Sequence, residues 1–251
     1  MKDTKELVRY VIDKSIVKAN RDMLSMCILG ILAGMAISLG AVANLVVSSD
    51  FYTLGNAGVG KFFGATVFPV GLIIIVLLGY DLFTSNCLLI SAVYEKKINV
   101  FQFVKNLILI LFFNFIGCIF IAYITAKTGT LSESAKNLLF SMSEHKVHAD
   151  AINIILKAIL CNVLVCSATL LGYGCKDAIG KIFGIWFPIM LFIVLGYDHV
   201  VANMLYLPTA YMLGYNISFS QIFYNLFFTT IGNFIGGAFF AITPLYIMYR
   251  K

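Results

Sequence analysis

The sequence predicts an all-α integral membrane protein in which six transmembrane helices form an inverted three-helix repeat. Three observations carry this prediction. Of the 251 residues, 61% are hydrophobic and only 12% are charged, about half the charged fraction of a soluble domain. Uncharged apolar runs long enough to cross a bilayer recur along the chain. Short motifs of the first half return in the second half at nearly constant spacing.

Six apolar segments are long enough to span a bilayer, which takes about 20 helical residues. We expect them near residues 24–47, 62–93, 104–126, 152–174, 182–211 and 221–247. Residues 1–22 are predicted to form a cytoplasmic amphipathic helix along the membrane face, because apolar and charged side chains alternate there with helical spacing. Charges throughout this segment argue against a secretory signal peptide. The remainder, 23–251, is predicted to be a single six-span domain.

The basic residues predict the orientation of the chain. With six spans, both termini share one side of the membrane with the loops 94–103 and 175–181. That side carries thirteen Lys and Arg residues, and the other side carries four. Because basic residues accumulate in cytoplasmic loops, we expect a multi-pass protein of the bacterial inner membrane with both termini in the cytoplasm. This asymmetry accounts for the net charge of +6 without a nucleic-acid partner.

Four motifs are repeated in the same order in the two halves, about 23–127 and 150–251. "GKFFG" (60–64) returns as "GKIFG" (180–184), Phe68-Pro69 as Phe187-Pro188, "LGYD" (78–81) at 195–198, and "NFIG" (114–117) at 233–236. Each half holds three spans, an odd number, so the second half enters the bilayer from the opposite side. Inverted repeats are typical of transport proteins, whose substrate sites lie near the midplane between interrupted helices. The repeat therefore favours a conduit over a membrane enzyme or a passive anchor.

The repeated Leu-Gly-Tyr-Asp predicts that helices 2 and 5 are interrupted. Gly79 and Gly196 permit an abrupt change of backbone direction. We expect Asp81 and Asp198 to be structural caps that accept hydrogen bonds from the free N–H groups of the following half-helices. Irregular backbone at membrane depth is tolerated only where it is buried in protein or lines a wet cavity. The breaks are therefore the expected place for a functional site.

Ionisable side chains within spans are costly and usually mark function. Lys157 could provide a positive field for an anion, or could extend to the membrane interface. His199 could be a neutral packing residue bonded to Asn162 or Asn203, but Leu82 occupies its place in the first half, and this asymmetry favours a function. No paired metal ligands and no Ser/His/Asp set accompany the histidine. We therefore predict no metal, no cofactor and no enzymatic activity.

The residues around the breaks predict the kind of solute. A lysine without a carboxylate partner, an imidazole and neutral hydroxyl donors suit a small monovalent anion and oppose the entry of cations. Neutral donors near the breaks are Thr84, Ser85 and Asn203. Bulky apolar residues that could narrow a pore there are Phe68, Leu72, Phe83 and Phe192.

Three stretches resemble signatures of the formate/nitrite transporter family. "GYDLFTSN" (79–86) resembles its Ω-loop, "LKAILCNVLVC" (156–166) its fourth-helix motif and "GYDHVVANM" (196–204) its fifth-helix motif. The resemblance extends over essentially the whole chain. It implies an aquaporin-like six-span protomer that assembles into a homopentamer in the lipid bilayer, with a separate pore in each protomer.

Carried over position by position, the resemblance also implies residue roles. His199 would be the central pore histidine, Lys157 the outer lysine that attracts anions, and Thr84 the Ω-loop threonine that faces the histidine. Asn162 and Asn203 would accompany the lysine and the histidine. The implied cytoplasmic constriction consists of Leu72, Leu82 and Phe83, and the outer one of Phe68 and Phe192. The family commonly has Glu at position 198 and Ser at position 200; Asp198 keeps the carboxylate, whereas Val200 removes a hydroxyl and leaves the substrate preference open.

The residues and the resemblance together predict a membrane channel for small monovalent weak-acid anions. Size and loops are most similar to the clostridial hydrosulfide channel, so hydrosulfide is the first expected substrate, with formate and nitrite as competitors. Lys157 would draw the anion in, and it would pass His199 and Thr84 between the two constrictions, with or without transient protonation. A proton-coupled formate or nitrite transporter of the same family stays open as an alternative. An aquaporin-like neutral-solute channel is disfavoured because the sequence has no Asn-Pro-Ala motif.

Overall fold

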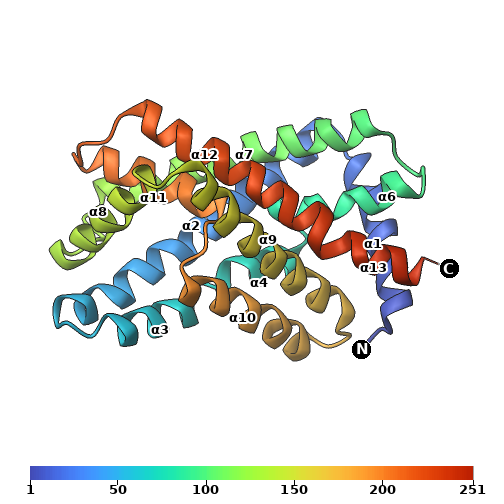
Figure 1. Cartoon of the computed structure of the whole chain (residues 1–251), viewed down its shortest axis with the longest axis horizontal. Helices are drawn as coiled ribbons and strands as arrows, with labels where there is room; N and C mark the ends of the chain where they lie inside the picture. Colours follow the sequence, from blue (N-terminus) through green and yellow to red (C-terminus); the bar gives the residue numbers. More distant parts are fainter. Residues whose placement is uncertain (251) are drawn as a thin grey trace.

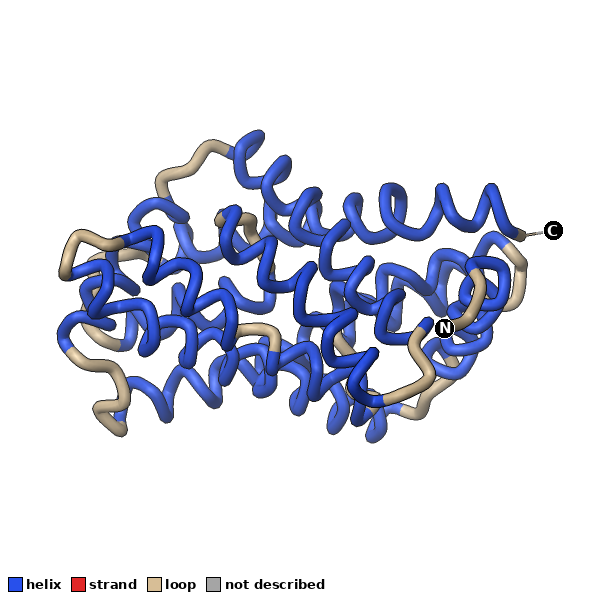
Figure 2. The backbone as a smooth tube through the Cα atoms, turned by 90° about the horizontal axis from the view of Figure 1, so that it is seen from below, coloured by secondary structure: helices blue, strands red, loops and turns tan. Residues whose placement is uncertain are grey.

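The computed structural model describes residues 1–250, which form helices and connecting loops without a strand in that range (Figure 2). Six segments are long and apolar enough to span a membrane, in agreement with the predicted spans: Met23–Thr53, Ala57–Leu78, Val100–Lys127, Ala151–Gly174, Ala178–Leu195 and Phe219–Tyr249. Both termini lie at one end of the long axis, called here the terminal face, and the opposite end is the distal face (Figure 1). Lys251, counted among the cytoplasmic basic residues, lies outside the described residues.

The first half contains three spans, and the second of them is interrupted. α1 (Thr4–Ala19) precedes α2 (Met23–Thr53), the first span. The second span consists of α3 (Ala57–Val67) and α4 (Val70–Leu78), followed after a break by α5 (Phe83–Asn86), η1 (Cys87–Leu89) and α6 (Ile90–Tyr94). The third span is α7 (Val100–Lys127). The predicted interruption is therefore confirmed, and a further break at Phe68-Pro69 was not predicted.

The second half repeats this order from the opposite face. α9 (Ala151–Gly174) is followed by α10 (Ala178–Leu195), a break, and α11 (Val200–Met212). The last span runs through α12 (Phe219–Ile235), the π-helical segment η2 (Gly236–Ile242) and α13 (Thr243–Tyr249). Gly79 and Gly196 end α4 and α10 with φ of 76° and 70°, in the left-handed region that glycine adopts without steric cost. The inverted repeat with interrupted helices 2 and 5 is confirmed.

An additional helix, α8 (Glu133–Val147), occupies the connection between the halves. It was not predicted. α8 lies at the distal face, as α1 lies at the terminal face (Figure 1). Lys18 near the end of α1 stands four residues before Asp22, the N-cap of α2, and Lys146 near the end of α8 stands four residues before Asp150, the N-cap of α9. The symmetry of the chain thus extends to α1 and α8, while the division at residues 22 and 23 stays a prediction.

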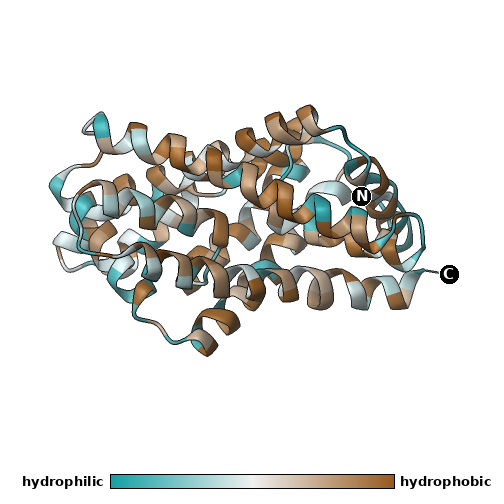
Figure 3. Ribbon diagram, turned by 90° about the horizontal axis from the view of Figure 1, so that it is seen from above, coloured by the Kyte–Doolittle hydropathy of each residue, from teal (hydrophilic) through white to brown (hydrophobic). Residues whose placement is uncertain are grey.

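Glycines bring the spans of each half into close contact. A Cβ atom at Gly34 of α2 would lie 2.1 Å from the Asn114 carbonyl oxygen, and one at Gly117 of α7 would lie 2.1 Å from the Ile31 carbonyl oxygen. Small residues at such crossings let membrane helices pack backbone to backbone. Hydrophobic residues predominate in the middle of the helices, and hydrophilic residues gather towards the two ends of the long axis (Figure 3). The tight α2–α7 contact places Asn114 next to the first break.

Candidate functional site

One asparagine holds the interrupted backbone of the first half. Asn114 of α7 accepts a hydrogen bond from the backbone N–H of Phe83 at 2.9 Å. Its Nδ2 donates to the carbonyl oxygens of Gly30, at 2.8 Å, and Asp81, at 3.0 Å. A side-chain amide donates and accepts at once, so this fully buried residue supplies both kinds of partner that a helix break leaves unsatisfied.

Asn233 of α12 does the same in the second half. It accepts a hydrogen bond from the Val200 N–H at 2.8 Å and donates to the carbonyl oxygens of Ala158 and Asp198 at 2.8 Å and 2.9 Å. Both asparagines belong to the repeated "NFIG" motif. The repeat of this motif therefore reflects the need of each break for a partner on the third helix of its half.

The prediction that Asp81 and Asp198 cap the half-helices is wrong. The N-cap residues of α5 and α11 are Leu82 and His199. Among residues 1–250, neither aspartate side chain accepts a hydrogen bond from a backbone N–H of a half-helix; the backbone N–H groups of Phe83, Val200 and Ala202 are bound by Asn114, by Asn233 and by the histidine ring. The carboxylates face cationic side chains instead. A buried carboxylate without a counter-charge is costly, whereas the N–H groups of the half-helices already have other acceptors.

Asp81 is the centre of a charged network towards the terminal face. Nζ of Lys18 lies 3.0 Å from its Oδ1, and Arg21 pairs with Oδ2. Lys18 also donates to Asn86 Oδ1 at 2.8 Å, and Asn86 donates to Asp81 at 3.4 Å. Burial acts to lower the pKa of the Lys18 ammonium, but Tyr173 and Asp81 outweigh it and raise that pKa above its ordinary value. The network fastens α1 to the half-helix that follows the first break.

The same network recurs towards the distal face around Asp198. Lys146 of α8 pairs with its carboxylate, and Asn203 donates to Oδ1 at 3.1 Å. Asn225 accepts a hydrogen bond from Asn203 at 2.9 Å and donates to the Lys146 carbonyl oxygen at 2.9 Å. In the first half Asn106 makes the equivalent contacts, because it accepts a hydrogen bond from Asn86 at 2.9 Å and donates to the Lys18 carbonyl oxygen at 3.0 Å. The two networks therefore match in their lysine, aspartate and asparagine contacts, whereas Arg21 pairs with Asp81 alone. The second network fastens α8 to α11 as the first network fastens α1 to α5.

Lys146 was missed as a site residue, whereas Lys157, expected on the outer side, lines the distal cavity. Lys157 is exposed on α9 and has no carboxylate within 4 Å among residues 1–250. Hydropathy draws attention to Lys157 because this lysine lies inside an apolar run. Lys146 was overlooked because it belongs to a polar helix, which folds back over the second break. The signal that could have found it is its spacing of four residues from Asp150, which matches that of Lys18 from Asp22.

His199 lies at the start of α11 and is 2% exposed. Its Nδ1 accepts a hydrogen bond from the Ala202 N–H at 3.2 Å, and its Nε2 lies 3.1 Å from Thr84 Oγ1. A backbone N–H only donates, so Nδ1 carries no proton. The neutral ring therefore bears its hydrogen on Nε2 and donates it to the Thr84 hydroxyl oxygen. The two breaks are thus joined directly, through a histidine of one half and a threonine of the other.

Thr84 is held from the side of α9. Its carbonyl oxygen accepts hydrogen bonds from Asn162 Nδ2 at 3.2 Å and from Cys166 Sγ at 3.3 Å. The next residue, Ser85, bonds through its hydroxyl to Thr169 at 2.9 Å. Apart from His199, the Thr84 hydroxyl has no hydrogen-bond partner among residues 1–250. Its own hydrogen is consequently available to a bound solute.

Aromatic and aliphatic residues surround the His199–Thr84 pair. The Phe192 ring stacks on the imidazole, with 5.9 Å between centroids and 25° between planes, and Phe68 packs edge-on against Phe192 at 5.5 Å. Leu72 follows Phe68 by one helical turn towards Gly79. Five residues expected at constrictions are almost fully buried: Phe68, Leu72, Leu82, Phe83 and Phe192. Their assignment to two separate constrictions stays a prediction.

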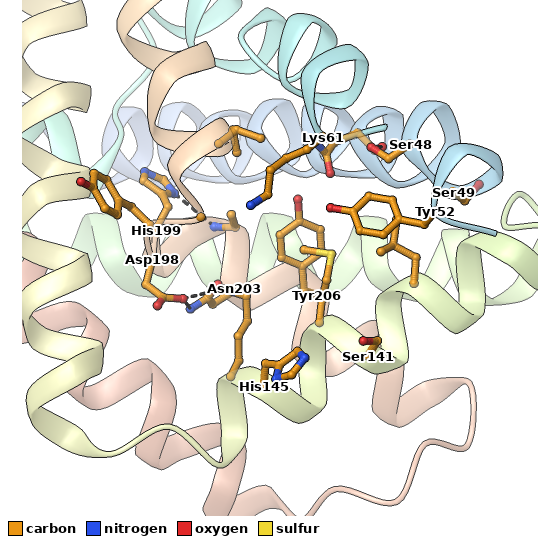
Figure 4. Close-up of a pocket in the computed structure, with 18 of the residues that line it drawn as sticks. Ser48, Ser49, Tyr52, Lys61, Ser141, His145, Asp198, His199, Asn203 and Tyr206 are labelled. Carbon is orange, nitrogen blue, oxygen red and sulfur yellow. Dashed lines mark hydrogen bonds and ion pairs between the residues drawn. The ribbon is translucent and has the colours of Figure 1, made fainter. Parts of the chain in front are cut away.

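A cavity of about 570 Å³ opens from the distal face and ends at His199 (Figure 4). It is called here the distal cavity. Figure 4 shows Tyr52, Lys61 and Tyr206 directed into it from α2, α3 and α11. Its lining also includes His145, Lys146, Lys157, Phe192, Asp198 and Asn203. Asp198 is the single carboxylate in the lining, against three lysines, so the cavity carries an excess of positive charge.

The structure thus brings most of the predicted residues together. His199, Thr84 and Asn162 form one hydrogen-bonded group, and Asn203 joins the adjacent Asp198 network. The alternative that the His199 ring is hydrogen-bonded to Asn162 or Asn203 is wrong, since the partners of the ring are the Thr84 hydroxyl and the Ala202 N–H. What each residue does in transport stays a prediction.

Comparison with known proteins agrees with this geometry. A family model described as "Formate/nitrite transporter" matches residues 5–247. The chain is 38% identical over 248 residues to the formate channel BtFdhC of Bacillus thuringiensis, and the match covers 98% of this chain and 95% of that protein. The matched region therefore includes the residues of both breaks and of both charged networks.

Two solved structures share the fold. A pentameric formate channel with formate bound superposes with a TM-score of 0.80 at 27% identity, covering 91% of this chain and 98% of that one. An FNT family ion channel superposes with a TM-score of 0.87 at 24% identity, covering 98% of both chains. The arrangement of interrupted helices described above is thus found in experimentally determined structures.

Proposed function

The chain belongs to the formate/nitrite transporter family, and we propose that it is a membrane channel for small monovalent weak-acid anions such as formate. One observation carries this proposal: a buried His199–Thr84 pair joins the two breaks at the end of a positively lined cavity. The names of the relatives, a formate channel and a formate-bound channel, support the same solute class.

The charge of the distal cavity supports an anion. A cavity lined by one sign of charge between low-dielectric walls raises the local concentration of the opposite ion. Lys157, exposed and without a carboxylate partner, attracts the anion, while Lys146 is already paired with Asp198. The same field opposes cations. The anion then meets Phe192 and Phe68, the proposed outer constriction.

The chemistry at the centre rests on the orientation of two hydrogen bonds. His199 donates through Nε2 to Thr84, which leaves the Thr84 hydroxyl hydrogen to donate to the anion. An unpaired charge in an apolar passage costs several kcal/mol, so the solute crosses either with this donor or after taking a proton. Nδ1 of His199 is occupied by Ala202, so the ring orients the donor, and the proton comes from water. Leu72, Leu82 and Phe83 form the proposed constriction towards the terminal face.

Formate leads the list of proposed substrates. The relative that is 38% identical is named a formate channel. We give this similarity over the whole chain more weight than the resemblance in size and loops to the hydrosulfide channel. Hydrosulfide and nitrite are further proposed substrates, because both are small monovalent anions of weak acids. Val200, next to the histidine, is the position at which these solutes are expected to be distinguished.

We further propose a homopentamer in the bacterial inner membrane, with the termini in the cytoplasm. The fold is shared with a channel whose structure is pentameric. Large apolar side chains are exposed on the outer surface of the spans, among them Phe112, Phe120, Phe187 and Phe223, as lipid or a neighbouring protomer requires. The distal cavity then opens to the outside of the cell.

A solute panel in proteoliposomes tests the proposal. Formate, nitrite, hydrosulfide and glycerol fluxes are measured at several pH values, with and without a clamped membrane potential. We expect flux of the weak-acid anions and none of glycerol. A potential-dependent flux indicates a channel for the anion, whereas a flux driven by the pH gradient alone indicates the proton-coupled alternative. Glycerol flux without anion flux would contradict the proposal.

A further inference from the structure

The repeated Gly-Lys motif places one lysine at each face of the molecule. Lys61 follows Gly60 in "GKFFG", and Lys181 follows Gly180 in "GKIFG". The inverted repeat puts Lys61 of α3 on the distal side and Lys181 of α10 on the terminal side. None of the hydrogen bonds and ion pairs of the site described above involves either lysine. The two positions are equivalent by symmetry, so a difference between them is informative.

Lys61 reaches the second break. Its Nζ lies 3.9 Å from the place that a Cβ atom on Gly196 would occupy, two residues before Asp198. α3 can come this close to the cavity wall because Gly64, one turn after Gly60, packs directly on α2: a Cβ there would lie 2.0 Å from Ser48 Oγ. No corresponding contact exists at the first break, where a Cβ on Gly79 would have no atom within 4 Å.

The charge of Lys61 is also uncompensated. No carboxylate lies within 4 Å of its Nζ among residues 1–250, and the single carboxylate in the cavity lining is paired with Lys146. The symmetric Lys181 also has no carboxylate within 4 Å of its Nζ among residues 1–250, but it has Asp177 one helical turn before it. The Gly180 backbone N–H holds the pKa of the Asp177 carboxyl below its ordinary value, and the Lys181 charge acts in the same direction. The residue at the position of Asp177 in the first half is Ala57.

We propose that Lys61 is a further anion-binding residue, which holds a small monovalent anion at the second break before it enters the passage beside Phe192. This rests on the proposed function. The anion lies beside the Lys61 ammonium, in the part of the distal cavity that Gly196 and Phe192 also line. Gly196 leaves the approach open because it has no side chain. Lys61 thereby determines how tightly the entrance binds anions, while His199 and Thr84 control their passage through the centre.

The test compares Lys61→Gln with Lys181→Gln, a matched control at the symmetric position. Formate influx into proteoliposomes is measured over a range of formate concentrations at low and high ionic strength. We expect Lys61→Gln to raise the half-saturating formate concentration about 3- to 10-fold at low ionic strength, as loss of a steering charge does. The maximal flux stays unchanged. The effect shrinks in high salt, where charges are screened over about 3 Å at 1 M.

Two further variants and the wild type complete the test. Lys61→Arg, which keeps the charge, is expected to restore the half-saturating concentration, and Lys181→Gln to behave as the wild type. Equal effects of Lys61→Gln and Lys181→Gln, or none from Lys61→Gln at low salt, would overturn the inference while leaving wild-type formate flux, and hence the proposed function, in place. Absence of wild-type flux of any anion would overturn both.

Discussion

At the scale of single residues, each break depends on one asparagine that makes three hydrogen bonds. Removing the side chain of Asn114 leaves the Phe83 N–H and the Asp81 carbonyl group without this partner inside the protein, and it also removes the link to the Gly30 carbonyl of α2. A buried polar group without a partner costs about 1–3 kcal/mol. The structure of the break is therefore expected to be sensitive to a substitution far from it in the sequence.

We predict that Asn114→Ala and Asn233→Ala each lower the melting temperature of the purified protein by several degrees. Thermal unfolding in detergent, followed by circular dichroism, measures this. Asn56→Ala is the control, because Asn56 is exposed and its side chain makes no capping hydrogen bond. Equal melting temperatures for Asn114→Ala and Asn56→Ala would show that the break does not depend on the asparagine.

The Lys146–Asp198 pair makes a second prediction at this scale. Its side chains are 15% and 8% exposed, and breaking a buried pair by removing one partner costs about 3–5 kcal/mol. Lys146→Gln and Asp198→Asn should each destabilise the protein, and the double variant should lose less than the two single losses combined. Melting temperatures of the three variants measure the coupling. Strictly additive losses would contradict it.

A control for this cycle lies on the same helix. Lys136 pairs with Glu133, whose side chain is 82% exposed, and exposed pairs contribute about 0–1 kcal/mol. Lys136→Gln should leave the melting temperature nearly unchanged. A loss as large as that of Lys146→Gln would mean that the effect comes from α8 in general and not from the buried pair.

Contacts could be predicted where the two halves differ or where the family resemblance supplies a partner, and the prediction failed where the partner is distant in the sequence. The contrast of Leu82 with His199 drew attention to the histidine, and the resemblance supplied Thr84, which the structure places in contact with it. The caps at Asp81 and Asp198 were assigned by local spacing, but the hydrogen bonds come from α7 and α12. Local sequence cannot indicate that a third helix provides a better donor and acceptor than the adjacent carboxylate.

At the scale of elements, the halves are held together by glycine-mediated crossings. The α2–α7 contact has no room for a methyl group at Gly34 or Gly117. Overpacking of this kind typically costs about 1–3 kcal/mol, and here the obstacle is backbone, which cannot rotate away. This crossing also positions Asn114, so a change in the packing of α2 on α7 is expected to disturb the first break as well.

We predict that Gly34→Ala and Gly117→Ala strongly reduce the yield of folded protein in the membrane. Gly58→Ala is the matched control in α3, since a Cβ there would meet nothing within 4 Å and alanine favours a helix over glycine. Fluorescence-detected size-exclusion chromatography of the three variants checks this. A normal elution profile for Gly34→Ala would mean that α2 and α7 are less tightly packed than described.

The spans and the amphipathic α1 were predictable from the sequence, and the polar α8 was not. The spans follow from long apolar runs, and the breaks follow from the repeated Leu-Gly-Tyr-Asp. The helix α8 was not predicted, because its 15 residues are polar on most sides and resemble a surface loop in composition. Its role becomes apparent only when Lys146 is seen to occupy the place of Lys18 in the symmetric network.

At the scale of the whole molecule, the two faces differ in charge, which predicts sidedness in the membrane. Thr130 lies at the distal face in the connection between α7 and α8, and Lys97 lies in the loop between α6 and α7; both are exposed. In intact cells, a membrane-impermeant maleimide should label Thr130→Cys, and Lys97→Cys only after permeabilisation. The wild type, with its own six cysteines, provides the background. The reverse labelling pattern would invert the proposed orientation.

The overall architecture was predictable because composition, span count and repeat each constrain it independently. An odd number of spans per half forces inversion, and inversion brings the two breaks together near the middle. The cavity could not be predicted, because α8 closes one side of it. Its charge likewise depends on which lysines are paired, and that is known only from the contacts.

The central claim is that His199 controls passage through its bond to Thr84. His199→Asn isolates this bond, because asparagine is a favoured N-cap that can still accept the Ala202 N–H but is too short to reach Thr84. Its formate flux in proteoliposomes is the most direct measurement, with the melting temperature recorded on the same sample. We predict that His199→Asn retains the wild-type melting temperature within a few degrees and changes formate flux or its selectivity over nitrite and hydrosulfide at least tenfold. A folded His199→Asn protein with wild-type flux and selectivity would contradict the account.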